Sequence, residues 1–310
     1  MALYRFSFLT GLLISLIAVI LGASHAHAAT PGLSITMTPS STELHAAPGA
    51  STSSTFTVVN QGTMSYPILL SVAPYHVEGD SYDPQFTPLP GTTDASSWIR
   101  FTDPAPSILG KNTTTTLGYT LAVPKDTAPG GYYAVIFAET NPEAKDGGVT
   151  PHNRVGNILY ITVDGDVAHK GALQPASPDV PSVIWGTRTD LGMLVNNTGG
   201  VHFVTTAHIR VTSLFGRTLF SGRFERYILP QTQRLITTAW EKLPPVGIYK
   251  VSRDATIAGS SQALPTKYIV IIQPWIAIVG GLALILLVVL AVKSRKTNVT
   301  KDKSSPDAQA

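Results

Sequence analysis

Apolar and polar residues alternate along much of this chain, which is the pattern of β-strands with one buried face. Between 113 and 123, apolar residues occupy every second position from Leu117 onward. Residues 132–138 are apolar on both faces, which is typical of a strand at the centre of a sheet. Further strands are expected at 33–38, 53–59, 67–75, 98–102, 158–163, 191–197, 201–214, 217–225, 234–240, 247–255 and 267–272.

Turn residues separate these strands, and their order is the same in the two halves of the chain. Each half has an Asn-x-Gly turn, beginning at Asn60 and at Asn197, and later a Pro-x-Gly element that leads into a tyrosine strand, at Pro129 and at Pro245. Short strands joined by Gly and Pro turns favour a sandwich. The sequence therefore predicts an all-β fold of two tandem immunoglobulin-like (Ig-like) antiparallel sandwiches, at 29–165 and 166–268, with Trp240 and Tyr249 buried in the second.

Two apolar stretches, one at the start of the chain and one before its last residues, contain no strand pattern. Residues 1–28 have the features of a secretory signal peptide, with Arg5 followed by an apolar stretch and the cleavage motif Ala26-His27-Ala28. Residues 269–292 are apolar for long enough to form one transmembrane helix. The basic tail 293–310 predicts a cytoplasmic C-terminus and an extracellular N-terminus in the cell membrane, and it reads as disordered.

The composition of the chain excludes several kinds of functional site. The chain has no cysteine, which excludes disulfides, cysteine-ligated zinc and thiol nucleophiles. Of the charged residues, 16 basic and 17 acidic ones lie outside the signal and the tail, so the ectodomain is close to neutral and a nucleic-acid partner is not expected. No phosphate loop, metal-ligand spacing or nucleophile motif is present, and we expect no enzyme activity, cofactor or metal.

Two groups of polar residues are candidates for metal binding or catalysis by residue type. His202 and His208 are interpreted as a surface pair, since no carboxylate accompanies them in the sequence. Glu78, Asp80 and Asp83 could offer oxygen ligands to calcium, but the other ligands and the turn glycine of a known calcium loop are absent, which favours a solvated loop.

Aromatic residues near a long polar insertion are the best candidates for binding. The insertion spans 78–97, and Tyr75, Tyr82 and Trp98 lie in or beside it. Exposed aromatic side chains on such a loop would give a large contact area at small entropic cost. We therefore predict that Tyr75, Tyr82 and Trp98 bind a partner.

Several segments carry a resemblance to a known family. VNNTGGVHF, ILPQTQRLITTAW and PPVGIYKV within 195–251 resemble the second domain of the WxL-interacting surface proteins of Gram-positive bacteria, and FTVVNQG with VPKDTAPGGYYAVIFAE is similar to their first domain. The resemblance implies a first domain that engages peptidoglycan or a cell-wall partner and a second domain that contacts surface or host proteins.

These observations leave three hypotheses. A membrane-anchored binding or scaffold protein of the bacterial cell envelope, with peptidoglycan or cell-surface proteins as partners, fits a neutral ectodomain without catalytic groups. An extracytoplasmic assembly chaperone that binds its client by strand addition would instead use an unpaired sheet edge. A sandwich-fold glycan hydrolase would need two carboxylates that converge in a cleft.

Overall fold

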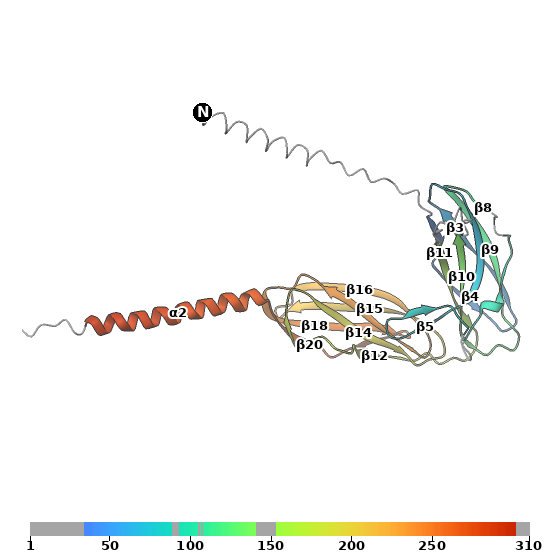
Figure 1. The fold of residues 1–310 in the computed structure, drawn as a ribbon. Helices are drawn as coiled ribbons and strands as arrows, with labels where there is room; N and C mark the ends of the chain where they lie inside the picture. Colours follow the sequence, from blue (N-terminus) through green and yellow to red (C-terminus); the bar gives the residue numbers. More distant parts are fainter. Residues whose placement is uncertain (1–33, 89–92, 105, 107, 141–152, 302–310) are drawn as a thin grey trace, which may run out of the picture.

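The chain folds into two β-sandwiches followed by one long helix (Figure 1). The computed structural model describes residues 34–301 apart from 89–92, 105, 107 and 141–152. The predicted signal peptide, 1–28, lies outside the described residues. The prediction of an all-β fold with Ig-like sandwiches and one C-terminal apolar helix is confirmed.

The first sandwich consists of two main sheets and a small hairpin. One sheet has the order β1-β3-β9-β7, the other β2-β11-β10-β4-β8, and β5 pairs with β6. Their bounds are β1 Ile35–Thr38, β2 Ser41–Ala46, β3 Ser51–Asn60, β4 Tyr66–Pro74, β5 His76–Glu78, β6 Asp83–Gln85, β7 Ile99–Phe101, β8 Ile108–Leu109, β9 Thr113–Ala122, β10 Gly130–Thr140 and β11 Arg154–Val163. A 3-10 turn, η1 (Ser96–Trp98), precedes β7.

The second sandwich has the same plan. Its sheets have the orders β12-β14-β17 and β13-β20-β18-β15-β16, and β19 pairs with β18. The bounds are β12 Gly171–Pro175, β13 Val183–Trp185, β14 Thr189–Asn197, β15 Phe203–Ser213, β16 Thr218–Ile228, β17 Thr232–Trp240, β18 Val246–Ile257, β19 Ser260–Ala263 and β20 Lys267–Ile272. Each strand in the two sheet orders of the second sandwich thus has a counterpart in the first sandwich.

Not every strand pair is antiparallel, which differs from the sequence-based expectation. In each sandwich the first strand pairs with one sheet, and the chain then crosses to the other sheet, where β2 runs parallel to β11 and β13 runs parallel to β20. Pro39 and Pro178 lie at the two crossings. Proline has no N–H to donate to a ladder, which favours an interruption of the strand pairing at these two crossings.

The two Asn-x-Gly turns form the same buried corner. The Oδ1 atom of Asn60 accepts from the N–H of Gly62 at 2.9 Å, and that of Asn197 accepts from Gly199 at 2.8 Å. Each amide also donates to the carbonyl four residues on and to the carbonyl of a distant strand end, at Leu109 and at Ile228. The repeated turn order in the sequence therefore corresponds to a repeated structure.

Each sandwich has its own apolar core. Phe56, Tyr119 and Leu121 are fully buried in the first. In the second, Trp240 and Tyr249 are buried, as predicted, and their ring centroids lie 6.2 Å apart.

The C-terminal helix begins later than the sequence suggested. Residues 269–272 belong to β20, which pairs with β18 and β13, so the prediction of helix from 269 is wrong. Helix α2 spans Pro274–Lys301, and proline suits the first turn of a helix because its missing N–H would be unpaired there. The window Pro274–Ala291 is long and apolar enough to cross a membrane. The helix also runs through 293–301, where the sequence predicted a disordered tail.

Candidate functional site

The polar insertion after β4 lies against the second sandwich. Tyr75 and Tyr82 join Tyr133, Val135, Phe137 and Tyr160 of the first sandwich and Leu229 of the second in one buried cluster, which we call the junction cluster. The expectation that Tyr75 and Tyr82 are exposed on a free loop is wrong, because their rings pack between the sandwiches. Whether they contact a partner stays a prediction.

Tyr82 is the best-connected residue of the insertion. Its hydroxyl accepts a hydrogen bond from the N–H of Leu229 and lies 2.9 Å from the Oγ1 atom of Thr232. The guanidinium of Arg234 lies over its ring at 4.3 Å from the centroid. Burial raises the pKa of the Tyr82 hydroxyl, so it remains neutral in the junction.

Asp80 ties the same insertion to β17. Its backbone carbonyl accepts from the N–H of Leu235 at 2.8 Å, and its carboxylate accepts from the side chain of Gln233 at 2.6 Å. The carboxylate of Asp83 accepts from Ser81. Among the described residues, no group of three or more His, Asp or Glu side chains could hold a metal ion.

Trp98, the third predicted residue, lies away from the junction cluster. It is partly buried against the first core, where its ring centroid is 4.7 Å from that of Tyr132. The structure thus brings Tyr75 and Tyr82 together but places Trp98 elsewhere.

His202 is a junction residue that the sequence analysis misplaced. It is buried rather than exposed, and its Nδ1 atom lies 3.2 Å from the Tyr133 hydroxyl. Its Nε2 atom is 3.6 Å from the Glu43 carboxylate, too far for a good hydrogen bond, and burial lowers the pKa of His202 although Glu43 opposes this. His208 instead pairs with Asp254 at 3.0 Å. Both histidines therefore have a carboxylate neighbour, supplied from a distant strand that the sequence could not indicate.

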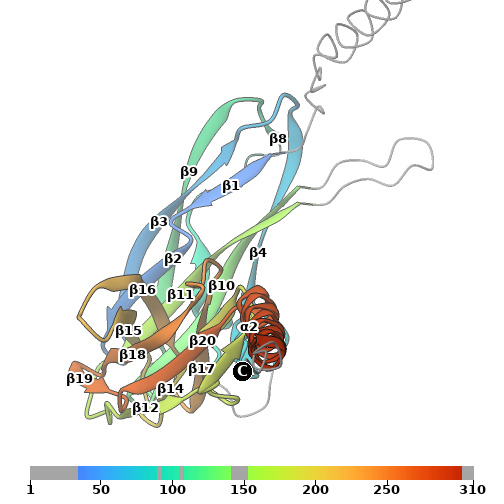
Figure 2. The ribbon, with the colours of Figure 1, turned by 90° about the vertical axis from the view of Figure 1, so that its left-hand side faces the viewer.

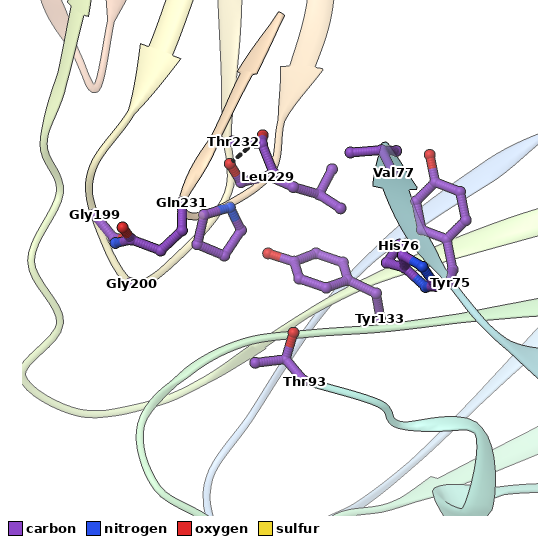
Figure 3. A pocket seen from close by; sticks show the side chains of 11 residues that line it. Tyr75, His76, Val77, Thr93, Tyr133, Gly199, Gly200, Leu229, Gln231 and Thr232 are labelled. Atoms are coloured by element: carbon purple, nitrogen blue, oxygen red, sulfur yellow. Dashed lines mark hydrogen bonds between the residues drawn. The ribbon is translucent and has the colours of Figure 1, made fainter. Parts of the chain in front are cut away.

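A hollow of about 460 Å³ opens beside the junction cluster. Figure 3 shows the ring of Tyr133 directed across it toward Leu229 and Gln231, with Tyr75 and His76 behind. Among the described residues that line it, His76 is the one histidine and none is Asp or Glu, the residue types that glycan hydrolysis uses in pairs.

The first sandwich has an open sheet edge. β4 pairs with β10 along Ile68–Pro74, while on its other side β8 pairs with Tyr66 and Pro67 alone. Within the described part of the chain, no strand pairs with this outer side between 68 and 74. Backbone N–H and C=O groups along such an edge are available to another strand.

Exposed apolar side chains lie beside this edge. Leu69 is 55% exposed and Ile108 is 61% exposed, and Met64 is exposed just before β4. Ile108 pairs with Pro67, which lies on the same face of β4 as Leu69, so the two apolar side chains are diagonal neighbours. We call Met64, Leu69, Ile108 and the outer side of Ile68–Pro74 the β4 edge.

Comparisons with known proteins add no family. No protein-family model matches the chain, and no curated protein matches it. Solved structures that resemble it include the class 5 fimbriae chaperone CfaA, with 10% identity, 76% of this chain and 99% of that chain covered and a TM-score of 0.39. The E. coli chaperone DraB has 16% identity, coverage of 77% and 97% and a TM-score of 0.36.

A single PapD-like domain of human CEP192 also resembles the chain. It has 18% identity and a TM-score of 0.31, and covers 44% of this chain and 89% of that one. At these identities and scores the likenesses carry no argument about function. The fold rests on the strand pairing itself.

Proposed function

We propose that this protein is a non-enzymatic binding module of the cell envelope that takes an extended segment of a partner protein on the β4 edge. One observation carries the proposal: no described strand pairs with the outer side of Ile68–Pro74, and Leu69 and Ile108 are exposed beside it. In strand addition, main-chain hydrogen bonds give affinity and the side chains on one face give selectivity. The β4 edge offers both.

The chemistry of the edge indicates what kind of segment would fit. The outer face presents Leu69 and Ile108, Met64 is exposed just before β4, and between Tyr66 and Pro74 β4 carries no charged side chain. A partner strand with apolar residues at every second position would cover these side chains while its backbone completes the ladder. Unpaired apolar edges are a liability in a soluble protein unless something covers them.

Anchoring at a membrane is part of this proposal. Helix α2 would hold the module in the cell membrane, with the sandwiches outside and the basic C-terminal end in the cytoplasm. The resemblance to WxL-interacting proteins is compatible with a surface-protein partner. Peptidoglycan, the other partner that this resemblance implies, is an alternative ligand, and the experiment below separates the two.

The proposal can be tested by crosslinking from the edge. A photo-crosslinking amino acid at Leu69 of the full chain, in cells that make the protein, should capture one partner protein through one short segment, which mass spectrometry can map. An added Ile108→Glu substitution should reduce capture by at least tenfold. A matched Val183→Glu substitution, at an exposed apolar residue of the second sandwich, should leave it unchanged.

Purified peptidoglycan provides the contrasting measurement. Sedimentation of the full chain with peptidoglycan, unaffected by Ile108→Glu, together with no protein captured at Leu69, would contradict strand addition. It would favour the wall-binding alternative instead.

A further inference from the structure

Helix α2 is tied directly to the end of the second sandwich. One residue, Gln273, separates β20 from α2. Its N–H donates to the carbonyl of Pro245 at 2.8 Å, its side-chain amide donates to the carbonyl of Leu243 at 2.7 Å, and its Oε1 atom accepts from the indole of Trp275 at 2.7 Å. A link of one hydrogen-bonded residue therefore joins the end of the second sandwich to the helix, so the two cannot move far apart.

Large apolar side chains are exposed at this same end. Phe215, in the turn between β15 and β16, is 99% exposed, and its neighbour Leu214 is also exposed. Trp185 and Val246, both exposed, pair with Ile272 at the end of β20, and Trp275 is exposed at the start of α2. We call Trp185, Leu214, Phe215, Val246 and Trp275 the apolar rim.

The β15–β16 turn reaches the same level as the helix start but is displaced sideways. Ser213 pairs with Tyr249, which pairs with Ile269, so the two residues beyond Ser213 bring Phe215 about level with Ile271. Between β20 and β15 lies β18, which puts the turn at least about 10 Å from the helix. Figure 2 looks at this end with α2 in front and the β15–β16 turn well to one side.

The turn itself is well held. The N–H of Ser213 donates to the carbonyl of Arg217, that of Gly216 donates to Ser213, and that of Arg217 donates to the Ser213 hydroxyl. Phe215 is thus presented by an ordered turn and has no neighbour that buries it. Phe215 and the adjacent Leu214 form an exposed apolar pair, and contiguous exposed apolar side chains mark sites of contact with protein or membrane.

The charges around the apolar rim are mostly positive. Arg188, Arg217 and Lys242 lie in the turns at this end, against Glu241 in the same turns and Asp190 at the start of β14, which lies 3.9 Å from Arg188. Basic side chains near apolar anchors favour an anionic lipid surface, to which they add electrostatic attraction. Tryptophan is also the residue that concentrates at the membrane–water interface.

We infer that the apolar rim docks the second sandwich onto the surface of an anionic lipid bilayer, with Phe215 inserted among the lipids beside helix α2. The inference rests on the proposal that α2 crosses a membrane, but it is independent of the β4 edge. Two separated contacts, α2 and the β15–β16 turn, fix the tilt and rotation of the sandwich on the membrane. A single flexible tether would fix neither.

Site-specific fluorescence in vesicles tests this. Because the chain has no cysteine, single Leu214→Cys, Ser261→Cys and Leu284→Cys variants of the full chain can carry an environment-sensitive fluorophore. They are reconstituted in vesicles of phosphatidylcholine and phosphatidylglycerol, 3:1, that contain nitroxide quenchers at a shallow or a deep acyl position. The Leu214 site should be quenched at least threefold by the shallow nitroxide, the Leu284 site by the deep one, and the Ser261 site by neither.

Changes to the turn and to the lipid test whether Phe215 and anionic lipid cause the quenching at Leu214. Phe215→Ser in the Leu214→Cys background should lower the shallow quenching at least twofold, and so should replacing phosphatidylglycerol with phosphatidylcholine. Deep quenching at Leu284 with no more quenching at Leu214 than at Ser261 would overturn the docking and leave the anchor standing. A missing signal at Leu284 would overturn the anchor, and a blue shift at Leu214 without lipid quenching would mean that protein covers the turn.

Discussion

The two sandwiches share a plan but use the same end differently. At the end of the first sandwich where β10 begins, Gly130 has a φ of 152° and leads to Tyr132. At the corresponding end of the second sandwich, where β18 begins, Gly247 has a φ of 154° and leads to Tyr249. In the first sandwich this end is covered, since the N–H of Gly131 donates to Gly200 and Tyr133 contacts His202. In the second, the equivalent end carries α2 and the apolar rim. The same end of the repeated unit thus packs on the other sandwich in the first case and continues into α2 in the second.

Loss of the buried asparagine corner should have the largest effect. Asn60→Ala and Asn197→Ala each leave several buried main-chain groups without a partner. Each should reduce the stability of its own sandwich by about 4 kcal/mol, measured by hydrogen exchange resolved by peptide. Asn196→Ala, at the less buried neighbouring residue, is the control and should cost much less. If one corner tolerated the change, the two sandwiches would not be equivalent.

The second prediction concerns a difference between the cores. Arg253 is buried where the first sandwich has Ile136, and its guanidinium donates to Asp179 at 2.5 Å. Asp179→Ala should destabilise the second sandwich by about 3 kcal/mol, because it leaves a buried charge unpaired. Adding Arg253→Met should restore most of the loss, since an apolar residue suits the first core at this position. Urea unfolding followed by the fluorescence of Trp240, in a background where the other three tryptophans are replaced by Phe, gives both values.

The same pair adds a dependence on pH. Burial alone would raise the pKa of the Asp179 carboxyl, but its hydrogen bonds to Arg253 and Lys267 lower it to about 2. A lowered pKa in the folded state means that this stabilisation is present above the ordinary pKa near 4 and is lost as the pH falls toward 2.

A weaker effect is expected at the junction. Tyr82→Phe removes the hydroxyl that receives the N–H of Leu229, so it should weaken the contact between the sandwiches by about 1.5 kcal/mol. Faster hydrogen exchange at 229–235, with exchange inside both cores unchanged, would report it. Tyr268→Phe, at an exposed tyrosine, is the matched control. Equal exchange in both variants would show that Tyr82 does not hold the sandwiches together.

The smallest effect is a pH response of the same contact. Burial lowers the pKa of His202 in the folded state, so between pH 7 and 5.5 the unfolded or separated form takes up more protons. Stability therefore falls as the pH falls through the ordinary value of about 6.5, by about 1 kcal/mol. The groups that face His202 are Tyr133, Glu43, His45 and His169. His202→Phe should remove the response, as measured by exchange at 229–235 at both pH values.

The two sandwiches also show which parts of the fold and of the candidate site can be predicted from the sequence. Alternation predicted the strands, and the Asn and Gly turns predicted the repeat, because both are local signals that the backbone needs wherever it folds. The start of α2 was misjudged because 269–272 are apolar in either context, and only the pairing with β18 makes them a strand. The aromatic insertion was recognised as unusual, yet its contact with β17 joins residues about 150 apart, which no local pattern records.

The direct passage from β20 into α2 also has a mechanical consequence. A pull that separates α2 from the sandwich acts along β20, which is paired with β18 on one side and with β13 on the other. Hydrogen bonds between strands lie across the strand direction, so such a force shears all of them together instead of opening them one after another. If α2 crosses a membrane as proposed, the anchor thus joins the second sandwich at a strand where several hydrogen bonds would oppose a pull at once.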